Sequence, residues 1–323
     1  MHRRTLLAGL AAAPLAAPAL AQPAWPSQSV RLVVPFAAGG PTDIPARLFA
    51  EELGKLLPQR VVVENRTGAG VVVGADMVAK APKDGHTLLY NTVAHSVLRG
   101  LFPRLPFDPI ADFAPVALLG QIPLVLVVNK DVPAQTMPEL LALFRANPGK
   151  YDYASSGNGG AVHLGTELLL KRAGGLRVNH VPYRGTGQVM PDLLSGRVAM
   201  YLDVAATGLS YAARGDVRAL AISAGQRIPQ APHLPTFAEA GVADAECYTW
   251  HMVLAPAGTP AAVLEAVNHA FNQAVKLPAV QHKLADMAML LRDDTTPAST
   301  SAYLLSEIAK WEGIIRDAGI KVD

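Results

Sequence analysis

The chain has 323 residues, of which half are hydrophobic and 17% are charged, and 28 basic and 26 acidic residues give a formal net charge of +2. This near-neutral balance offers no global attraction to nucleic acid or to an anionic membrane, so we expect no nucleic-acid partner. The length favours two lobes over one, and the single cysteine, Cys247, excludes an internal disulfide.

The chain begins with a pattern typical of an export signal. A basic start at residues 2–4 precedes the apolar run 5–20, and residues 19–21 fit a small-x-small cleavage site. The run is shorter than the roughly 20 residues of a membrane-spanning helix and contains two prolines. We therefore predict that residues 1–21 are a signal peptide and that the mature protein is periplasmic. The pair Arg3-Arg4 leaves export by Sec or by Tat open.

Strand and helix patterns alternate in the first third of the chain. We expect strands at 30–36, 60–64 and 86–91 and helices at 43–57 and 69–79. This order is typical of a parallel sheet, whose ligands lie at the carboxyl ends of the strands. A proline-punctuated stretch, 102–115, leads to the apolar run 116–129, which we interpret as a first crossing between two lobes.

The same alternation continues beyond this crossing. We expect helices at 136–146, 161–173 and 187–195, the first opened by a capping box at Thr136 and Glu139, and strands at 151–155, 177–182, 197–203 and 218–222. Segment 248–255 would cross back, and two helices, 260–276 and 299–318, would follow. We therefore predict that one lobe is built from both ends of the chain, with residues 22–120 and 250–323 in lobe 1 and 121–249 in lobe 2.

Two glycine-rich turns, 34–43 and 153–163, each follow a predicted strand and open a predicted helix. The first N–H groups of a helix have no intrahelical partner, and the helix dipole adds a partial positive charge there. Glycine also lets the backbone approach a ligand closely. The pair of turns therefore predicts one small anion held between the two lobes.

Eleven strings carry a resemblance to a known family, in order and with their spacing preserved. They are VPFAAGGPTDIPARLF, VVVENRTGAG, DGHTLLYNT, LPFDPIADFAPVALL, YASSGNGGAVHLGTELL, VPYRG, DLLSGRV, RALAIS, LPTFAEAG, LAPAGTP and EIAKWEGIIRDAGI. Together they resemble the Bug-type extracytoplasmic solute receptors of tripartite tricarboxylate transporters. The resemblance implies an α/β, type II periplasmic-binding-protein fold, with two doubly wound lobes joined by two crossing segments. It also implies a monomer without a cofactor that closes on a small carboxylate and delivers it to membrane permease subunits.

The ligand-binding residues implied by the resemblance lie in turns at the strand ends. They are Phe36, Gly39, Gly40, Thr42 and Asp43 in the first turn, Thr92 after the third strand, Ser155, Ser156, Asn158, Gly159 and His163 in the second glycine-rich turn, Tyr183, Arg184 and Gly185 in the next turn, and Asp203 at a later strand end. In such receptors backbone amides, hydroxyls and bridging waters commonly hold the carboxylate. This chain departs from the family pattern at Pro41 and His251, and it has polar Tyr90, Asn91 and His95 near the third strand's end; we expect these positions to set ligand identity.

Several of these residues also have purely structural interpretations. Asp43 is better explained as a helix N-cap than as a ligand contact. His163 could be a satisfied helix histidine, Arg184 a solvated turn residue, and Asp203 could pair with a cation in the hinge. Trp250 is better explained by packing between the lobes than by stacking on a ligand, and Cys247 by an inert buried thiol.

Catalytic motifs are missing from the sequence. No G-x-S-x-G, H-E-x-x-H or G-x-x-x-x-G-K-[ST] string occurs, and the nine histidines show no metal-ligand spacing. We therefore predict neither an enzyme nor a metal site. Two alternatives remain: a periplasmic sensor that reports the ligand to a signalling partner, and an α/β hydrolase that would use Ser156 and His163.

Overall fold

The computed structural model describes residues 25–183 and 185–321, so the predicted signal peptide at 1–21 lies outside the described residues. The strands are β1 (Val30–Val34), β2 (Val61–Asn65), β3 (Thr87–Thr92), β4 (Phe113–Val128), β5 (Asp152–Ser155), β6 (Asn179–Pro182), β7 (Met200–Val204), β8 (Arg218–Ile222), β9 (Tyr248–Pro256) and β10 (Leu290–Leu291). The helices are α1 (Asp43–Leu56), α2 (Val72–Ala79), α3 (Leu98–Leu101), α4 (Met137–Ala146), α5 (Ala161–Arg172), α6 (Thr186–Leu194), α7 (Ala205–Ala213), α8 (Ala261–Val275), α9 (Pro278–Ala285) and α10 (Pro297–Ala318), with the 3-10 turn η1 at Val93–His95.

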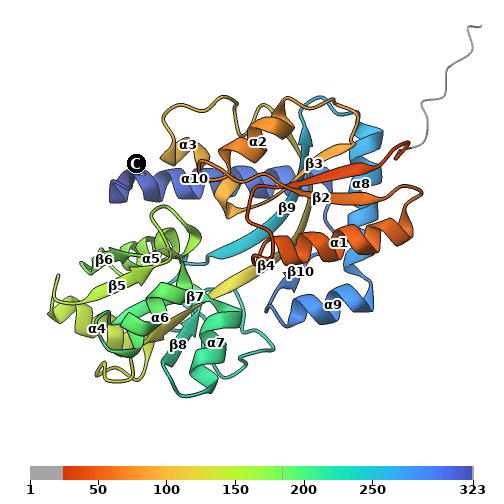
Figure 1. Cartoon of the computed structure of the whole chain (residues 1–323). Coiled ribbons are helices and arrows are strands. Elements are labelled where there is room, and N and C mark those ends of the chain that lie inside the picture. The colour runs from red at the N-terminus through yellow and green to blue at the C-terminus, as the bar shows by residue number, and fades with distance from the viewer. Residues whose placement is uncertain (1–24, 184, 322–323) are drawn as a thin grey trace, which may run out of the picture.

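The two lobes share one continuous sheet, with the strand order β2-β1-β3-β9-β4-β7-β5-β6 and with β8 and β10 beside β4. The first part of β4 pairs antiparallel with β9, and its last five residues, 124–128, pair with β7 and β8 in the second lobe. Figure 1 shows β4 and β9 running together from one lobe into the other. The two predicted crossing segments are thus neighbouring strands.

The long apolar run of β4 has a physical reason, because helices bury both of its faces. Leu124, Leu126 and Val128 belong to a core that includes side chains of α4 and α5, whereas Val125 and Val127 belong to a core with α6 and α7. Successive side chains of a strand point to opposite faces. A strand buried on both sides therefore carries apolar residues at every position instead of alternate ones.

The first lobe is built around β1 in the same way. Leu32 and Val34 pack with Phe49 of α1 and Phe271 of α8, and Val33 packs on the opposite face. The C-terminal helix α8 thus covers strands from the start of the chain, and Figure 1 shows α8 and α10 beside those strands. The residue boundaries of the two lobes stay a prediction.

The helix predicted at 69–79 begins later than expected. Ala69, Gly70 and Val71 have φ angles of 44°, 57° and 76°, so the chain makes a left-handed turn there and α2 begins only at Val72. A left-handed backbone conformation is energetically unfavourable for residues with a Cβ. The residue types at 69 and 71 therefore gave no reason to predict one.

Other differences concern short elements. The two predicted C-terminal helices, 260–276 and 299–318, are confirmed as α8 and α10, but the short α9 between them was not predicted, and neither were α3 and α7. The strand predicted at 197–203 begins only at Met200. At the start of α4, Thr136 accepts a hydrogen bond from the Glu139 amide as predicted, but the Glu139 carboxylate accepts from the amide of Gln135 instead of Thr136. Across residues 25–183 and 185–321, no helix combines the length and the apolarity needed to span a membrane.

Candidate functional site

A cleft of about 710 Å³ lies where the first-lobe loops face the start of α5. Its lining consists of Phe36, Ala37, Gly40, Pro41, Thr42, Ala69, Gly70, Val71, Thr92, Val93, Ala94, Val97, Leu101, Phe102, Asn158, Gly159, Gly160, Ala161 and Thr249. Strands β1, β2 and β3 are parallel, so the turns that follow them meet at one edge of the sheet. This edge is where the sequence predicted the ligand.

The first glycine-rich turn is held by Asp43, which is 1% exposed. Its carboxylate accepts hydrogen bonds from the Gly39 amide at 2.7 Å, Arg47 Nε at 2.7 Å and Asn65 Nδ2 at 2.8 Å. Burial would raise the pKa of Asp43, but these three bonds outweigh it and the pKa lies below its usual value. The N-cap interpretation is wrong, because Asp43 is the first residue inside α1 and binds the turn that precedes the helix.

The end of β3 contributes Thr92 to the cleft. Its Oγ1 accepts from the Ala94 amide at 3.4 Å, and its own amide donates to Asn91 Oδ1 at 2.9 Å. The Asn91 side chain also contacts His95 Nδ1 at 3.3 Å. Thr92 is therefore presented by a buried polar pair behind it.

The polar positions that we expected to set ligand identity lie mostly in that interior. The Tyr90 hydroxyl contacts His251 Nδ1 at 3.0 Å, and both side chains are buried, as are Asn91 and His95. Only Pro41 of this set lines the cleft. The buried residues therefore support the backbone of the cleft and do not line it.

In the second glycine-rich turn, some residues line the cleft and others are buried behind them. Asn158 and Gly159 line the cleft, whereas Ser155 and His163 are buried behind it. Ser155 Oγ contacts His180 Nε2 at 2.6 Å, and His163 Nδ1 accepts from the Gly159 amide at 3.0 Å. The rings of His163 and His180 stack with centroids 3.9 Å apart. Burial and the neighbouring His180 lower the pKa of His163 to about 4, which keeps Nδ1 free to accept that hydrogen bond at neutral pH.

The start of α5 offers backbone donors to the cleft. The first intrahelical bond runs from the Leu164 amide to Gly160 O, which leaves the amides of 161–163 without an intrahelical partner. No described side chain caps this helix, because Gly160 is at the N-cap. At the start of α1, by contrast, the amides of Asp43 and Ile44 already bond to Gly40 O. The anion site predicted for two helix starts therefore has its freer donors at α5.

The remaining predicted residues lie outside this lining. Tyr183 donates to the Asp192 carboxylate at 2.6 Å, and the Gly185 amide donates to Ser156 O at 3.2 Å. Arg184 lies outside the described residues.

Asp203 is fully buried at the end of β7. Its Oδ1 accepts from the Val204 amide at 2.8 Å, and its Oδ2 has no hydrogen-bond partner among the described residues. Burial raises the pKa of this carboxyl to about 7. The partners of Asp203 among the described residues are the Val204 amide and the Thr186 hydroxyl, so the alternative of a hinge ion pair is not formed with a described cation.

Of the predicted ligand residues, the cleft brings together six: Phe36, Gly40, Thr42, Thr92, Asn158 and Gly159. The described ones outside its lining are Gly39, Asp43, Ser155, Ser156, His163, Tyr183, Gly185 and Asp203. The lining residues that the sequence did not reveal are mainly apolar, including Val71, Val93, Val97, Leu101 and Phe102. In the sequence, an apolar residue after a strand is indistinguishable from a residue of the hydrophobic core. Only its position in the structure could have identified it as part of the cleft lining.

The hydrolase pairing of Ser156 with His163 is not formed among the described residues, where His163 Nδ1 accepts from the Gly159 amide and the His163 ring stacks on His180. Ser155 does contact a histidine, His180, but it is fully buried. A nucleophile needs a path to its substrate. Within the described parts of the chain, no group of three or more His, Cys, Asp or Glu residues is placed to hold a metal ion.

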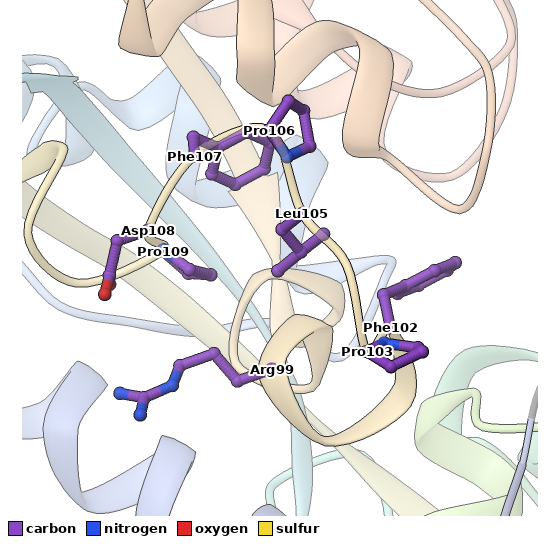
Figure 2. Close-up of a pocket in the computed structure, with 8 residues that line it drawn as sticks. All are labelled: Arg99, Phe102, Pro103, Leu105, Pro106, Phe107, Asp108 and Pro109. Carbon is purple, nitrogen blue, oxygen red and sulfur yellow. The ribbon is translucent and has the colours of Figure 1, made fainter.

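A second hollow, of about 450 Å³, lies over the proline-rich loop 102–109. Figure 2 shows Arg99 and Phe102 extending to opposite sides of this segment. Phe102 lines the main cleft as well, so the loop forms part of the cleft wall.

Comparisons with known proteins agree with this arrangement. Residues 45–320 match the family model of the tripartite tricarboxylate transporter family receptor, TctC. A protein from the tcbD-tcbE intergenic region of Pseudomonas sp. (strain P51) is 39% identical over 316 residues, which cover 97% of this chain and 94% of that protein. Protein BugT of Bordetella pertussis is 36% identical over 315 residues, covering 97% and 96%.

Solved structures show the same likeness. The periplasmic binding protein BugD superposes with a TM-score of 0.75 at 31% identity, over 92% of this chain and all of that chain. Rpa4515 of R. palustris, solved with adipate, superposes with a TM-score of 0.76 at 33% identity, over 92% and 100%. The predicted two-lobed periplasmic-binding-protein fold is thereby confirmed, as is the resemblance drawn from the eleven strings.

Proposed function

The chain belongs to the family of tripartite tricarboxylate transporter receptors, and from this premise we propose that it is a periplasmic receptor that captures a small carboxylate between its lobes and delivers it to membrane permease subunits. The proposal includes export through residues 1–21, a lobe boundary near residues 120 and 250, and a monomeric state. It also includes the absence of catalysis, with Ser155 buried and paired to His180.

The single observation that carries the proposal is the position of the α5 start. Its uncapped amides face a cleft whose opposite side bears the hydroxyl-containing side chains Thr42 and Thr92. Hydrogen bonds to a charged acceptor contribute about 1.5–3 kcal/mol each. Four or five such bonds could offset an association cost of order 4–15 kcal/mol and leave micromolar affinity.

We propose that Phe36, Gly40, Thr42, Thr92, Asn158 and Gly159 contact the ligand in this form of the protein. Tyr183, Arg184, Gly185 and Ser156 follow on the second lobe and would approach the ligand on closure. Gly39, Asp43, Ser155, His163 and Asp203 would support the turns.

Calorimetric titration of the mature protein with carboxylates tests the function. Thr92→Val keeps the side chain's shape but removes the hydroxyl, and we expect it to weaken binding by about 1–2 kcal/mol. Thr87→Val is a matched control on the same strand, where Thr87 is buried and accepts from Arg31 at 3.2 Å away from the cleft lining. Equal affinities for both variants would remove Thr92 from the site, and no heat with any carboxylate would contradict the proposed function.

A further inference from the structure

One side of the cleft is apolar. Six side chains, which we call the apolar wall, line it: Phe36, Val71, Val93, Val97, Leu101 and Phe102. They come from the turn after β1, the left-handed turn before α2, and the segment η1–α3, all in the first lobe. Four of them, Val71, Val93, Val97 and Leu101, are at least nine-tenths buried and continuous with the main core, so the wall is firmly packed.

The position of Phe102 in the apolar wall depends on Gly70, which lies opposite the ring and has no side chain. A Cβ added to Gly70 would lie 2.9 Å from Phe102 Cζ, so the ring rests directly on the glycine backbone. Gly70 also has a φ of 57°, which disfavours any other residue. An aromatic face is therefore held at a set position in the cleft.

The polar side of the cleft has hydrogen-bond donors for one negatively charged group of a ligand. Thr42, Thr92, Asn158 and Thr249 supply polar side chains, and the α5 start supplies amides. Among the described lining residues, none carries a charged side chain. A first carboxylate can be held by these donors and, on closure, by Arg184, which we propose approaches from the same lobe as α5. A second carboxylate placed against the apolar wall of the first lobe would lose its hydration without gaining a partner.

From this asymmetry we propose that the cleft selects a monocarboxylate with an uncharged apolar body, an aliphatic chain or an aromatic ring, over di- and tricarboxylates. The inference rests on the proposed function and narrows its substrate class. The carboxylate lies at the α5 start and the body lies on the apolar wall. Each methylene that leaves water on binding favours the complex by about fourfold in affinity.

Matched acids that differ by one carboxylate test the proposal. Calorimetry would compare hexanoate with adipate, and phenylacetate with its 4-carboxy derivative, on the mature protein. We expect each monoacid to bind at least about tenfold more tightly than its diacid, and affinity to rise about fourfold per methylene from butanoate to hexanoate. Tighter binding of the diacids would overturn this inference and leave the proposed function standing, whereas binding of no carboxylate would overturn both.

Variants of the wall give a second, independent measurement. Phe102→Ala should weaken hexanoate binding about tenfold, while Phe102→Leu keeps most of the apolar contact and most of the affinity. Leu105→Ala is the control, because Leu105 belongs to the same loop but lines only the second hollow. If Phe102→Ala binds hexanoate as tightly as Leu105→Ala does, the wall takes no part in binding and the inference fails.

A cation placed beside the apolar wall should remove most of the preference for the monoacid. Ala94 lines the cleft within η1 and is half-buried, so a lysine there can reach both the cleft and solvent. We expect Ala94→Lys to raise adipate affinity relative to hexanoate by about tenfold, provided that thermal melting shows a folded variant. An unchanged ratio in a folded Ala94→Lys protein would contradict the inference.

Discussion

Asp43 stands inside the turn that the sequence assigns to an anion, and its three hydrogen bonds explain how an acidic residue is tolerated there. It accepts from Gly39 in the turn, from Arg47 one helical turn on, and from Asn65 at the end of β2. The negative charge is thus satisfied within the protein, and Asp43 does not line the cleft. Its role is to fix the turn that presents Gly40 and Thr42.

Removing this carboxylate should destabilise the first lobe. Asp43→Ala leaves the Gly39 amide and Asn65 without their acceptor, and we expect the free energy of unfolding to fall by about 2–4 kcal/mol. Asp43→Asn keeps the shape and should cost less. The pKa of Asp43 in the folded protein lies below its ordinary value of 3.8. The carboxylate's contribution to the free energy of unfolding is therefore complete above pH 3.8 and is lost as the pH falls through the folded pKa. Urea unfolding at pH 7 and at pH 3 measures this; an Asp43→Ala protein as stable as the parent at pH 7 would contradict it.

His163 makes a second prediction at the scale of one residue. It must be neutral to accept from the Gly159 amide, and its pKa falls from 6.5 to about 4. The unfolded chain therefore binds more protons than the folded one between these values, and stability rises with pH across that window. The titratable neighbours are His180, stacked at 3.9 Å, and Tyr153 at 6.3 Å, which donates to Glu167.

Replacing the imidazole with a group that accepts but does not titrate isolates this effect. Between pH 7 and pH 4, we expect the parent protein to lose about 3 kcal/mol more of its unfolding free energy than His163→Gln does. Urea unfolding at pH 7, 5.5 and 4 gives the comparison, and His180 remains in both proteins as an internal control. Parallel pH profiles for the two proteins would show that His163 does not titrate in this way.

At the scale of elements, close packing of α7 on β4 depends on one glycine. A Cβ added to Gly208 would lie 2.4 Å from Val125 Cγ1, so the helix backbone rests on the strand's side chains. Gly54 in α1 has nothing within 4 Å of the same added atom. The same substitution should therefore have opposite effects at the two sites.

We expect Gly208→Ala to lower the free energy of unfolding by about 1–3 kcal/mol, because α7 must move away from Val125. Gly54→Ala should raise it by about 0.5–1 kcal/mol, because alanine loses less backbone entropy in a helix. Urea unfolding of both variants against the parent measures the two changes. Stabilisation by Gly208→Ala would mean that α7 is not packed on β4 as described.

Elements with a strong local signal could be predicted from the sequence, and those shaped by distant contacts could not. The continuous apolar run of β4 and the Thr136 cap of α4 were both readable. The left-handed turn at Ala69 and Val71 was not, because neither residue type favours a positive φ.

The site shows the same limit. Its glycine-rich turns were identified, but the pairing of Ser155 with His180 joins residues from adjacent strands, and the wall valines resemble ordinary core.

At the scale of the whole molecule, α10 ties the two lobes to the crossing strands. Glu307 Oε2 accepts from Trp250 Nε1 on β9 and from Trp311 Nε1 within α10, both at 3.0 Å. Trp250 is fully buried, in agreement with its interpretation as packing and not as a stacking surface. Farther along the helix, Asp317 pairs with Lys171 of α5, and Figure 1 shows α10 ending beside α5.

This arrangement makes a prediction about movement. Because β4 and β9 run side by side between the lobes, bending near residues 120–124 and 248–250 would carry the α5 start toward Thr42 and Thr92. A ligand favours whichever form contacts it from both sides. We expect saturating carboxylate to reduce the radius of gyration measured by small-angle X-ray scattering. Thr92→Val should show the same reduction only at higher ligand concentration, because it changes affinity and not the hinge. Identical scattering with and without a carboxylate that calorimetry shows to be bound would mean that the ligand enters without closure, and the amides of α5 would then have to hold it from one side alone.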